Sequence, residues 1–420
     1  MRLCIITLCA AGVLSAGIIS TPTGPLWASG FDNTGIGSLD LLFDPARFAL
    51  EGSYTYAVRN VEYESDNAQY VRDVTVDDFP PNVRPVTDGA RKAHATPNLW
   101  NYSVGAKAAL NDNLACLARL NNPGTILEEL PEDWNGRFAT IKTELTSLGY
   151  DLTCALSFSP TPGHKFSVIG GGKYIQTEIN VLKLSALIGG ISQAGVNLEG
   201  AGFGWRAGVA YEVPEYAIRA SLFYDHEVPI EATGNIETLF PLQGIAEFAM
   251  PSALEMRVQS GIAPRWLAFA GVKWVNWSSL DKLTVRGGLT DYSFLQIDRI
   301  FNFSDGWTVT AGVGHQLTEK MQLGSSITWD QGIGGPYSDT WQFGLGGSYK
   351  LTEAVTWSLG GALVYKTAAS GEFVGSETGL GPLIRPDRPS DWGTEYSDSF
   401  DLSYDASVNF GLTTKLKISF

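Results

Sequence analysis

Cysteine is scarce in this chain of 420 residues, which contains four, two of them (Cys4 and Cys9) close to its start. The other two, Cys116 and Cys154, cannot staple a protein of this size, so a disulfide-rich scaffold is excluded. Charged residues make up only 17% of the chain, and 29 Lys and Arg face 44 Asp and Glu. Because phosphate contacts need a basic face, nucleic acid is excluded as a partner.

Long hydrophobic runs are missing beyond the beginning of the chain. Met1 and Arg2 precede an apolar run over 3–19, and small residues follow as far as Ala28. This pattern predicts a secretory signal peptide over 1–28; the alternative is a membrane anchor, for which the run is barely long enough. No later stretch reaches about 18 apolar residues, so no helical membrane span is expected in the mature chain.

Enzyme motifs are also missing. The sequence contains no G-x-S-x-G, no complete phosphate-binding loop and no H-E-x-x-H. The four histidines, His94, His164, His226 and His315, form no cluster at metal-ligand spacing. We therefore expect no enzymatic activity, no metal and no cofactor.

What the chain does have is glycine, aromatic residues and a strong two-residue periodicity. It contains 47 Gly, 12 Trp, 16 Tyr and 20 Phe, a composition that favours β-strands. In the last segment, apolar side chains alternate with polar ones from Tyr404 to Phe420, which is the pattern of a strand with one apolar face. Fourteen such strands are expected, near 48–62, 98–110, 113–121, 143–159, 164–182, 201–213, 216–227, 251–262, 265–277, 305–316, 320–331, 339–351, 354–367 and 399–420.

The connections between these strands alternate between long and short. Two-residue turns such as 111–112 and 214–215 are followed by connections of about twenty residues or more, such as 122–142 and 228–250. Short periplasmic turns, long outer loops and an even number of strands are typical of an outer-membrane β-barrel. The apolar faces, with aromatic residues near the strand ends, should face lipid, and the polar faces should line the lumen. The fold class is therefore an all-β, antiparallel transmembrane barrel, and Phe420 suits an assembly signal.

Two of the expected outer loops are unusually apolar. In the first loop the candidate ligand-binding residues have helical spacing and are Leu184, Leu187, Ile188 and Ile191. In the second loop they are Leu239, Phe240, Leu242 and Phe248. Exposed apolar patches mark binding surfaces, although these loops could equally pack on each other.

Four cations are expected to point into the lumen from consecutive strands: Arg206, Arg219, Arg257 and Lys273. Acidic residues on the same faces (Glu212, Asp225, Glu255) could pair with them in a salt-bridge lattice. The functional alternative is that one or two of these cations bind the carboxylate head group of a cargo. Cys116 and Cys154 lie on neighbouring strands, and the sequence leaves open whether they are bonded or free.

The sequence resembles the outer-membrane long-chain fatty acid transporter family (FadL type). The resemblance rests on an ordered set of segments, namely 121–124, 202–208, 250–258, 266–274, 276–279, 307–314 and the Phe-terminated last strand. It implies a fourteen-stranded barrel over 48–420 and a hatch in the lumen formed by 29–47. It also implies a cargo groove between the third and fourth outer loops, and a kinked third strand through which cargo leaves sideways. Where family members often carry Asn-Pro-Ala after the hatch, this chain has Asp44, Pro45 and Ala46, and its hatch is short.

The expected function is passive uptake of a long-chain fatty acid or a related hydrophobic molecule by a monomer embedded in outer-membrane lipid. The alternatives are an aromatic or alkane hydrocarbon channel of the same fold, a structural or adhesive barrel without transport, and a general polar porin.

Overall fold

The computed structural model describes residues 30–72, 82–95, 97–186, 191–238, 241–289, 292–335, 337–380 and 393–420. The predicted signal peptide over 1–28 lies outside these residues. The described helices are four short 3-10 turns: η1 (Asp40–Phe43), η2 (Asn135–Phe138), η3 (Pro214–Tyr216) and η4 (Trp277–Ser279). None of the described helices is long and apolar enough to cross a membrane.

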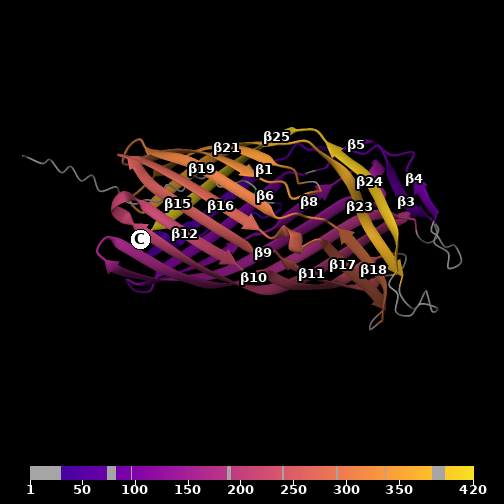
Figure 1. The fold of residues 1–420 in the computed structure, drawn as a ribbon, viewed down its shortest axis with the longest axis horizontal. Coiled ribbons are helices and arrows are strands. Elements are labelled where there is room, and N and C mark those ends of the chain that lie inside the picture. The colour runs from indigo at the N-terminus through magenta and orange to yellow at the C-terminus, as the bar shows by residue number, and fades with distance from the viewer. Residues whose placement is uncertain are drawn as a thin grey trace, which may run out of the picture.

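Fourteen antiparallel strands form a closed barrel, seen from the side in Figure 1. In order they are β1 (Phe48–Val58), β6 (Leu99–Ala109), β7 (Leu114–Asn121), β9 (Lys142–Thr161), β10 (His164–Ser185), β11 (Ser192–Val213), β12 (Ile218–Asp225), β15 (Ala253–Ala263), β16 (Trp266–Val275), β19 (Gly306–Gln316), β20 (Met321–Asp330), β21 (Thr340–Lys350), β22 (Val355–Lys366) and β25 (Ser407–Ser419). Each strand pairs with the next, and β25 pairs with β1 to close the ring. The predicted fold class and the fourteen strands of the barrel are confirmed.

Eleven further strands extend the wall beyond one end of this ring, and we call them the outer storey. They are β2 (Glu62–Glu64), β3 (Ala68–Arg72), β4 (Asn82–Pro85), β5 (Lys92–His94), β8 (Thr125–Glu129), β13 (Val228–Glu237), β14 (Leu242–Met250), β17 (Lys282–Leu289), β18 (Tyr292–Ile300), β23 (Ala369–Leu380) and β24 (Gly393–Tyr404). In Figure 1 the labels of β3, β4, β18 and β24 lie at the end of the molecule opposite the C-terminus.

The sequence predicted loops where these strands lie, and that part of the prediction is wrong. The helical spacing expected over 181–191 is also wrong as far as Ser185, because β10 continues to that residue and pairs residue by residue with β11. Residues 187–190 of this range lie outside the described residues. Extending the hydrogen-bonded ladder in this way satisfies backbone groups that a long loop would expose. The last predicted strand, 399–420, is in fact two strands separated at 405–406. Tyr404 consequently lies in the outer storey with its side chain buried, rather than on the lipid face.

The two faces of the wall have the polarity of a membrane barrel. Large apolar side chains are exposed on the outside: Phe203 is 75% exposed and Leu345 is 60% exposed. Inward-facing polar side chains such as Thr308 and Lys107 are buried. A soluble barrel would show the opposite arrangement, so the strands that form the ring are the membrane-spanning segments.

Cys116 and Cys154 form a disulfide between neighbouring strands. The two residues are direct partners in the ladder that joins β7 to β9. This settles the question that the sequence left open.

Candidate functional site

The residues between Gly30 and Arg47, which we call the N-terminal segment, lie against the inward face of the barrel. Leu39, Leu41 and Leu42 are buried in a cluster with side chains from the ring, including Leu117 and Phe223. At its beginning, the ring of Phe31 packs 4.1 Å from that of Trp277. The segment therefore contacts the lumen wall at two levels.

The four predicted lumen cations are all paired with carboxylates. Arg206 Nε donates to Asp225 Oδ1 at 2.8 Å, and Arg219 Nε donates to Glu212 Oε1 at 3.1 Å. Two pairs involve the N-terminal segment, because Arg257 bonds Asp40 and Lys273 bonds Asp32. Their arrangement is a salt-bridge lattice, one of the two alternatives that the sequence left open. That lattice includes acids of the N-terminal segment, which the sequence did not suggest.

Asp44, Pro45 and Ala46 lie where the N-terminal segment enters β1. Asp44 is buried, and its carboxylate accepts hydrogen bonds from Lys417 Nζ at 2.8 Å and from the backbone N–H of Ala46 at 2.9 Å. Lys107 Nζ donates to the carbonyl oxygen of Asp44 at 3.0 Å. These bonds fix the segment to the first and last strands of the ring.

The third strand of the ring, β7, is interrupted directly after the residues that pair with β9. β7 ends at Asn121, β8 begins at Thr125, and the residues between them leave the ladder. The N-terminal segment binds this break from inside: the backbone N–H of Asn33 donates to Pro123 O at 2.9 Å, and that of Thr125 donates to Phe31 O at 3.2 Å. The kinked third strand that the resemblance implied is thus present, and the segment covers it.

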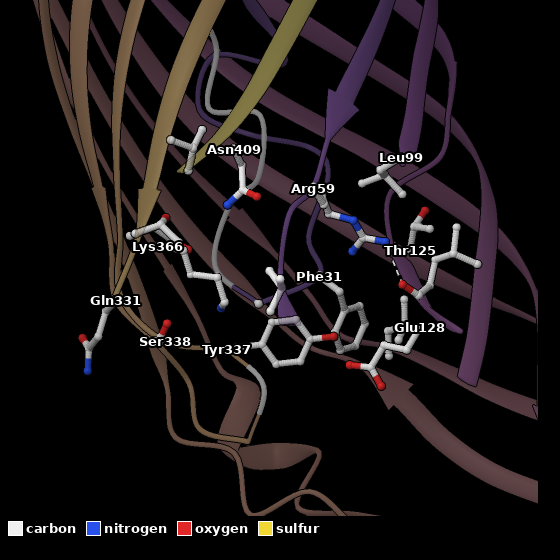
Figure 2. Close-up of a pocket in the computed structure, with 18 of the residues that line it drawn as sticks. Phe31, Arg59, Leu99, Thr125, Glu128, Gln331, Tyr337, Ser338, Lys366 and Asn409 are labelled. Atoms are coloured by element: carbon white, nitrogen blue, oxygen red, sulfur yellow. Dashed lines mark hydrogen bonds between the residues drawn. The ribbon is translucent and has the colours of Figure 1, made fainter. Parts of the chain in front are cut away.

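A cavity lies above Phe31, between the ring and the outer storey (Figure 2). We call it the upper cavity; the empty space between its lining residues, counted together with its open mouth, is about 810 Å³. Aromatic and aliphatic walls surround a few charged groups. Its lining includes Phe31, Val61, Tyr63, Leu99, Ile126, Tyr337 and Val364, with the charged residues Arg59, Glu128, Asp330 and Lys366.

The charged lining of the upper cavity consists of two cations, Arg59 and Lys366, and two carboxylates, Glu128 and Asp330. Arg299, which is outside this lining, lies close enough to Glu128 to favour its ionised form. Arg59 is fixed in place because Nε donates to Pro97 O at 2.9 Å and Nη2 donates to Leu127 O at 2.7 Å. Figure 2 shows its guanidinium directed toward the side of the cavity where Thr125 is labelled.

Burial perturbs the ionisable groups of this region, which lies outside the membrane-spanning segments. It raises the pKa of the Glu128 carboxyl, against the opposing effect of Arg299, while Tyr63 O–H donates to Glu128 Oε1 at 3.0 Å. It lowers the pKa of Arg299 to about 10 and that of Arg59 below its usual value. With a pKa of about 10, the guanidinium of Arg299 remains cationic at neutral pH.

A second cavity, which we call the lower cavity, lies beside the break in the third strand. Its charged lining consists of Asp32, Asp151, Lys173, Arg206, Asp225 and Lys273. Pro123, Gly149 and Trp277 also line it. The N-terminal segment contributes to both cavities, since Gly30 and Phe31 line the upper one and Asp32 and Thr34 line the lower one.

The predicted apolar loop residues are placed differently from expectation. Leu242 is buried in β14 and Phe248 packs against the same interior cluster, so neither belongs to an exposed loop. Leu184 is half-buried in β10, and Ile191, just before β11, is exposed. Leu187, Ile188, Leu239 and Phe240 lie outside the described residues.

Sequence reasoning missed most of the upper cavity. Lys366 could have been found, because it lies in phase with the lumen-facing Ser358 and Val364 of β22. Arg59 and Tyr337 lie between strands, where no periodicity indicates which way a side chain points. Among the described residues no group of three or more His, Cys, Asp or Glu could hold a metal ion.

A closed fourteen-stranded barrel with a lipid-facing exterior, a polar lumen and an apolar cavity at its outer end defines an outer-membrane transport barrel. The model of the outer membrane protein transport protein family (OMPP1/FadL/TodX) matches residues 42–333. The chain belongs to this family and is an integral protein of the outer membrane.

Individual relatives agree with this assignment. Outer membrane protein P1 of Haemophilus influenzae is 22% identical over 326 residues, which cover 69% of each chain. A long-chain fatty acid transport protein of Salmonella typhi is 22% identical over 147 residues, 31% of this chain and 33% of that relative.

Solved structures show the same fold. A FadL homologue of Pseudomonas aeruginosa superposes with a TM-score of 0.69 at 14% identity, covering 90% of this chain and 92% of that one. The toluene transporter TodX of Pseudomonas putida gives a TM-score of 0.60 at 13% identity, covering 95% of this chain and 97% of that one.

Proposed function

We propose that this protein carries long-chain fatty acids, or related molecules with an apolar chain and an acidic head, passively across the outer membrane. The observation that carries the proposal is the upper cavity, whose apolar walls surround the two cations Arg59 and Lys366. Such a site fits an amphipathic monoanion. Burial of an acyl chain, at about 0.8 kcal/mol per CH₂, would supply most of the affinity, and Arg59 or Lys366 would select the head group.

In this proposal the N-terminal segment acts as the hatch. It lies between the two cavities and hydrogen-bonds the break in the third strand. Cargo would pass from the upper to the lower cavity when the hatch shifts, and would leave through the break into the membrane. The proposal includes the division into a signal peptide over 1–28, a hatch over 29–47 and a barrel over 48–420.

Uptake of labelled oleate by a deletion strain complemented with this gene tests the function. Complementation should restore uptake, and an empty vector should not. Uptake that stays at the empty-vector level while the barrel is present in the outer membrane would refute the proposal.

A hydrocarbon channel is the second candidate, and one observation favours it. Arg206, Arg219, Arg257 and Lys273 already have carboxylate partners, so these lumen cations are neutralised as a neutral cargo would require. Replacing the four singly distinguishes the candidates, because uptake of a neutral hydrocarbon should not change, whereas uptake of an acid should fall where the head group binds.

A further inference from the structure

The disulfide between Cys116 and Cys154 lies on the lipid-facing side of the barrel wall. On β9 the residues in phase with Cys154 are Leu152 and Leu156, which are 57% and 56% exposed, whereas Thr153 between them is buried. Cys116 is the direct partner of Cys154 in the ladder, and directly opposed residues point to the same face of a sheet. Both cysteines therefore face the membrane, and neither faces the lumen.

The disulfide also lies halfway between two rows of aromatic side chains. Toward the outer storey, the ring of Tyr150 lies 6.1 Å from that of Tyr174. Toward the short turns, the ring of Phe158 lies 5.8 Å from that of Phe166. Cys154 is four residues from Tyr150 and four from Phe158, about 13 Å along the strand in each direction. Such aromatic rows mark the two interfaces of an apolar band about 25 Å tall, so the disulfide is near the middle of the hydrocarbon layer.

Small residues flank the two cysteines on this face. The ladder neighbour of Cys116 on β6 is Ala108, and that of Cys154 on β10 is Gly170. A side-chain carbon added at Gly170 would meet no neighbouring atom closer than 4.0 Å. This side of the disulfide is therefore open to the membrane rather than covered by protein.

The position of the disulfide excludes the reaction that makes it. Thiol–disulfide exchange needs a thiolate as the attacking group, and an ionised side chain at the centre of a bilayer is costly. Water-soluble oxidants do not enter the hydrocarbon layer. We propose that Cys116 and Cys154 are joined in the periplasm, by a dithiol–disulfide oxidase, before β7 and β9 enter the membrane.

The bond forms by two successive exchanges. The thiolate of one cysteine attacks the disulfide of the oxidase, forms a mixed disulfide and displaces one oxidase thiolate. The thiolate of the other cysteine then attacks the sulfur of the first, which closes the Cys116–Cys154 bond and displaces the second oxidase thiolate. Two electrons and two protons pass from the chain to the oxidase, which leaves as a dithiol. Cys4 and Cys9 belong to the predicted signal peptide, so the exported chain offers a single pairing.

Early closure of the disulfide sets the register of β7 against β9. β7 has only 8 residues, whereas β9 has 20, so the ladder between them offers few bonds to align the two strands. A slip of one residue would turn every side chain of β7 to the opposite face. Arg119, which lies opposite Asp151 on the lumen side, would then point into lipid. The finished bond prevents this slip, and after insertion it lies beyond the reach of water-soluble reductants.

Oxidised glutathione, a charged disulfide, tests whether the inserted cysteines can react. The protein is folded under reductant, reconstituted in nanodiscs, which leave both faces open to water, and freed of reductant. The natural thiols should be consumed roughly 60- to 300-fold more slowly in nanodiscs than in the urea-unfolded chain, because an ionised group is disfavoured by that factor at the bilayer centre. Equal rates in nanodiscs and in urea would overturn the proposal.

A single cysteine in the outer storey is the matched control. Asn235 is exposed on β13, so Asn235→Cys, made in a chain with Cys116→Ser and Cys154→Ser, should react with oxidised glutathione at similar rates in nanodiscs and in urea. This result would show that the reagent reaches the reconstituted protein and that slow reaction of the natural pair is due to its position.

Pulse-chase labelling of the exported chain tests the order of events in cells, and it does not require a reduced barrel to fold. Samples are quenched with acid, unfolded and labelled with a maleimide polymer, while unheated gels separate folded barrels from unfolded chains. Oxidised chains that are still unfolded should appear before folded barrels. Barrels that fold first and lose their thiols later would overturn the proposal. Neither experiment involves cargo, so the outcome is independent of the proposed function.

Discussion

Replacing Arg59 by Met should weaken the binding of a long-chain acid and leave the binding of its neutral ester unchanged. Two carbonyl oxygens hold the guanidinium at the upper cavity through Nε and Nη2, so its charge is already oriented before cargo arrives. A hydrogen bond to a charged group contributes about 1.5 to 3 kcal/mol, and each 1.4 kcal/mol is about tenfold in affinity. The dissociation constant for palmitate should therefore rise about 10- to 150-fold.

Equilibrium binding of labelled palmitate and methyl palmitate to purified protein in nanodiscs measures this effect. Arg59→Lys keeps the positive charge but lacks the guanidinium group that bonds both carbonyl oxygens. The affinity of this variant for palmitate should therefore lie between those of the natural protein and Arg59→Met. Arg91→Met is the control, because Arg91 pairs with Asp66 on the exposed surface of the outer storey. Since Arg59→Met also leaves the carbonyls of Pro97 and Leu127 without this donor, thermal unfolding must show that the barrel is intact.

Two results would refute the reasoning about Arg59. An equal loss for acid and ester would mean that the substitution disturbs the cavity as a whole rather than its charge. No loss for either ligand, in a folded protein, would mean that the head group binds elsewhere.

Further predictions concern the wall and the buried charges. Leu345→Arg on the lipid face should destabilise the barrel by about 2 to 4 kcal/mol, measured by guanidinium unfolding from vesicles, whereas Glu353→Arg in a short turn should not. Equal stability of the two variants would contradict the assignment of Leu345 to the lipid face. Because burial raises the pKa of Glu128, the folded protein holds the carboxyl proton more tightly than the unfolded chain does. Stability should therefore fall as pH rises between the unfolded and the folded pKa values of this group. Glu128→Gln should flatten this pH dependence in thermal unfolding, and an unchanged pH dependence would exclude Glu128 as its source. Replacing both Cys116 and Cys154 by Ser opens a link between residues 38 apart and should cost about 3 to 4 kcal/mol; an unchanged unfolding midpoint would contradict a stabilising role.

Period-two alternation predicted the ring because each strand there separates lipid from lumen. The outer storey was missed for a related reason, since it is bounded by water on one side and the contrast between faces is weaker. In β10 the alternation in fact continues, with Ile175, Ile179 and the half-buried Val181 packed in the interior cluster. The helical spacing of the leucines after Val181 competed with this signal, and pairing with β11 decided the outcome.

The candidate site was predictable only where strands carry it. Phase along a strand indicated that Arg206 and Lys273 point inward, and both do. Their partners could not all be predicted, because Asp32 lies in a segment without periodicity and reaches Lys273 only through the folded chain. The same applies to Arg59, which follows the end of β1 and finds its carbonyl partners in two other segments.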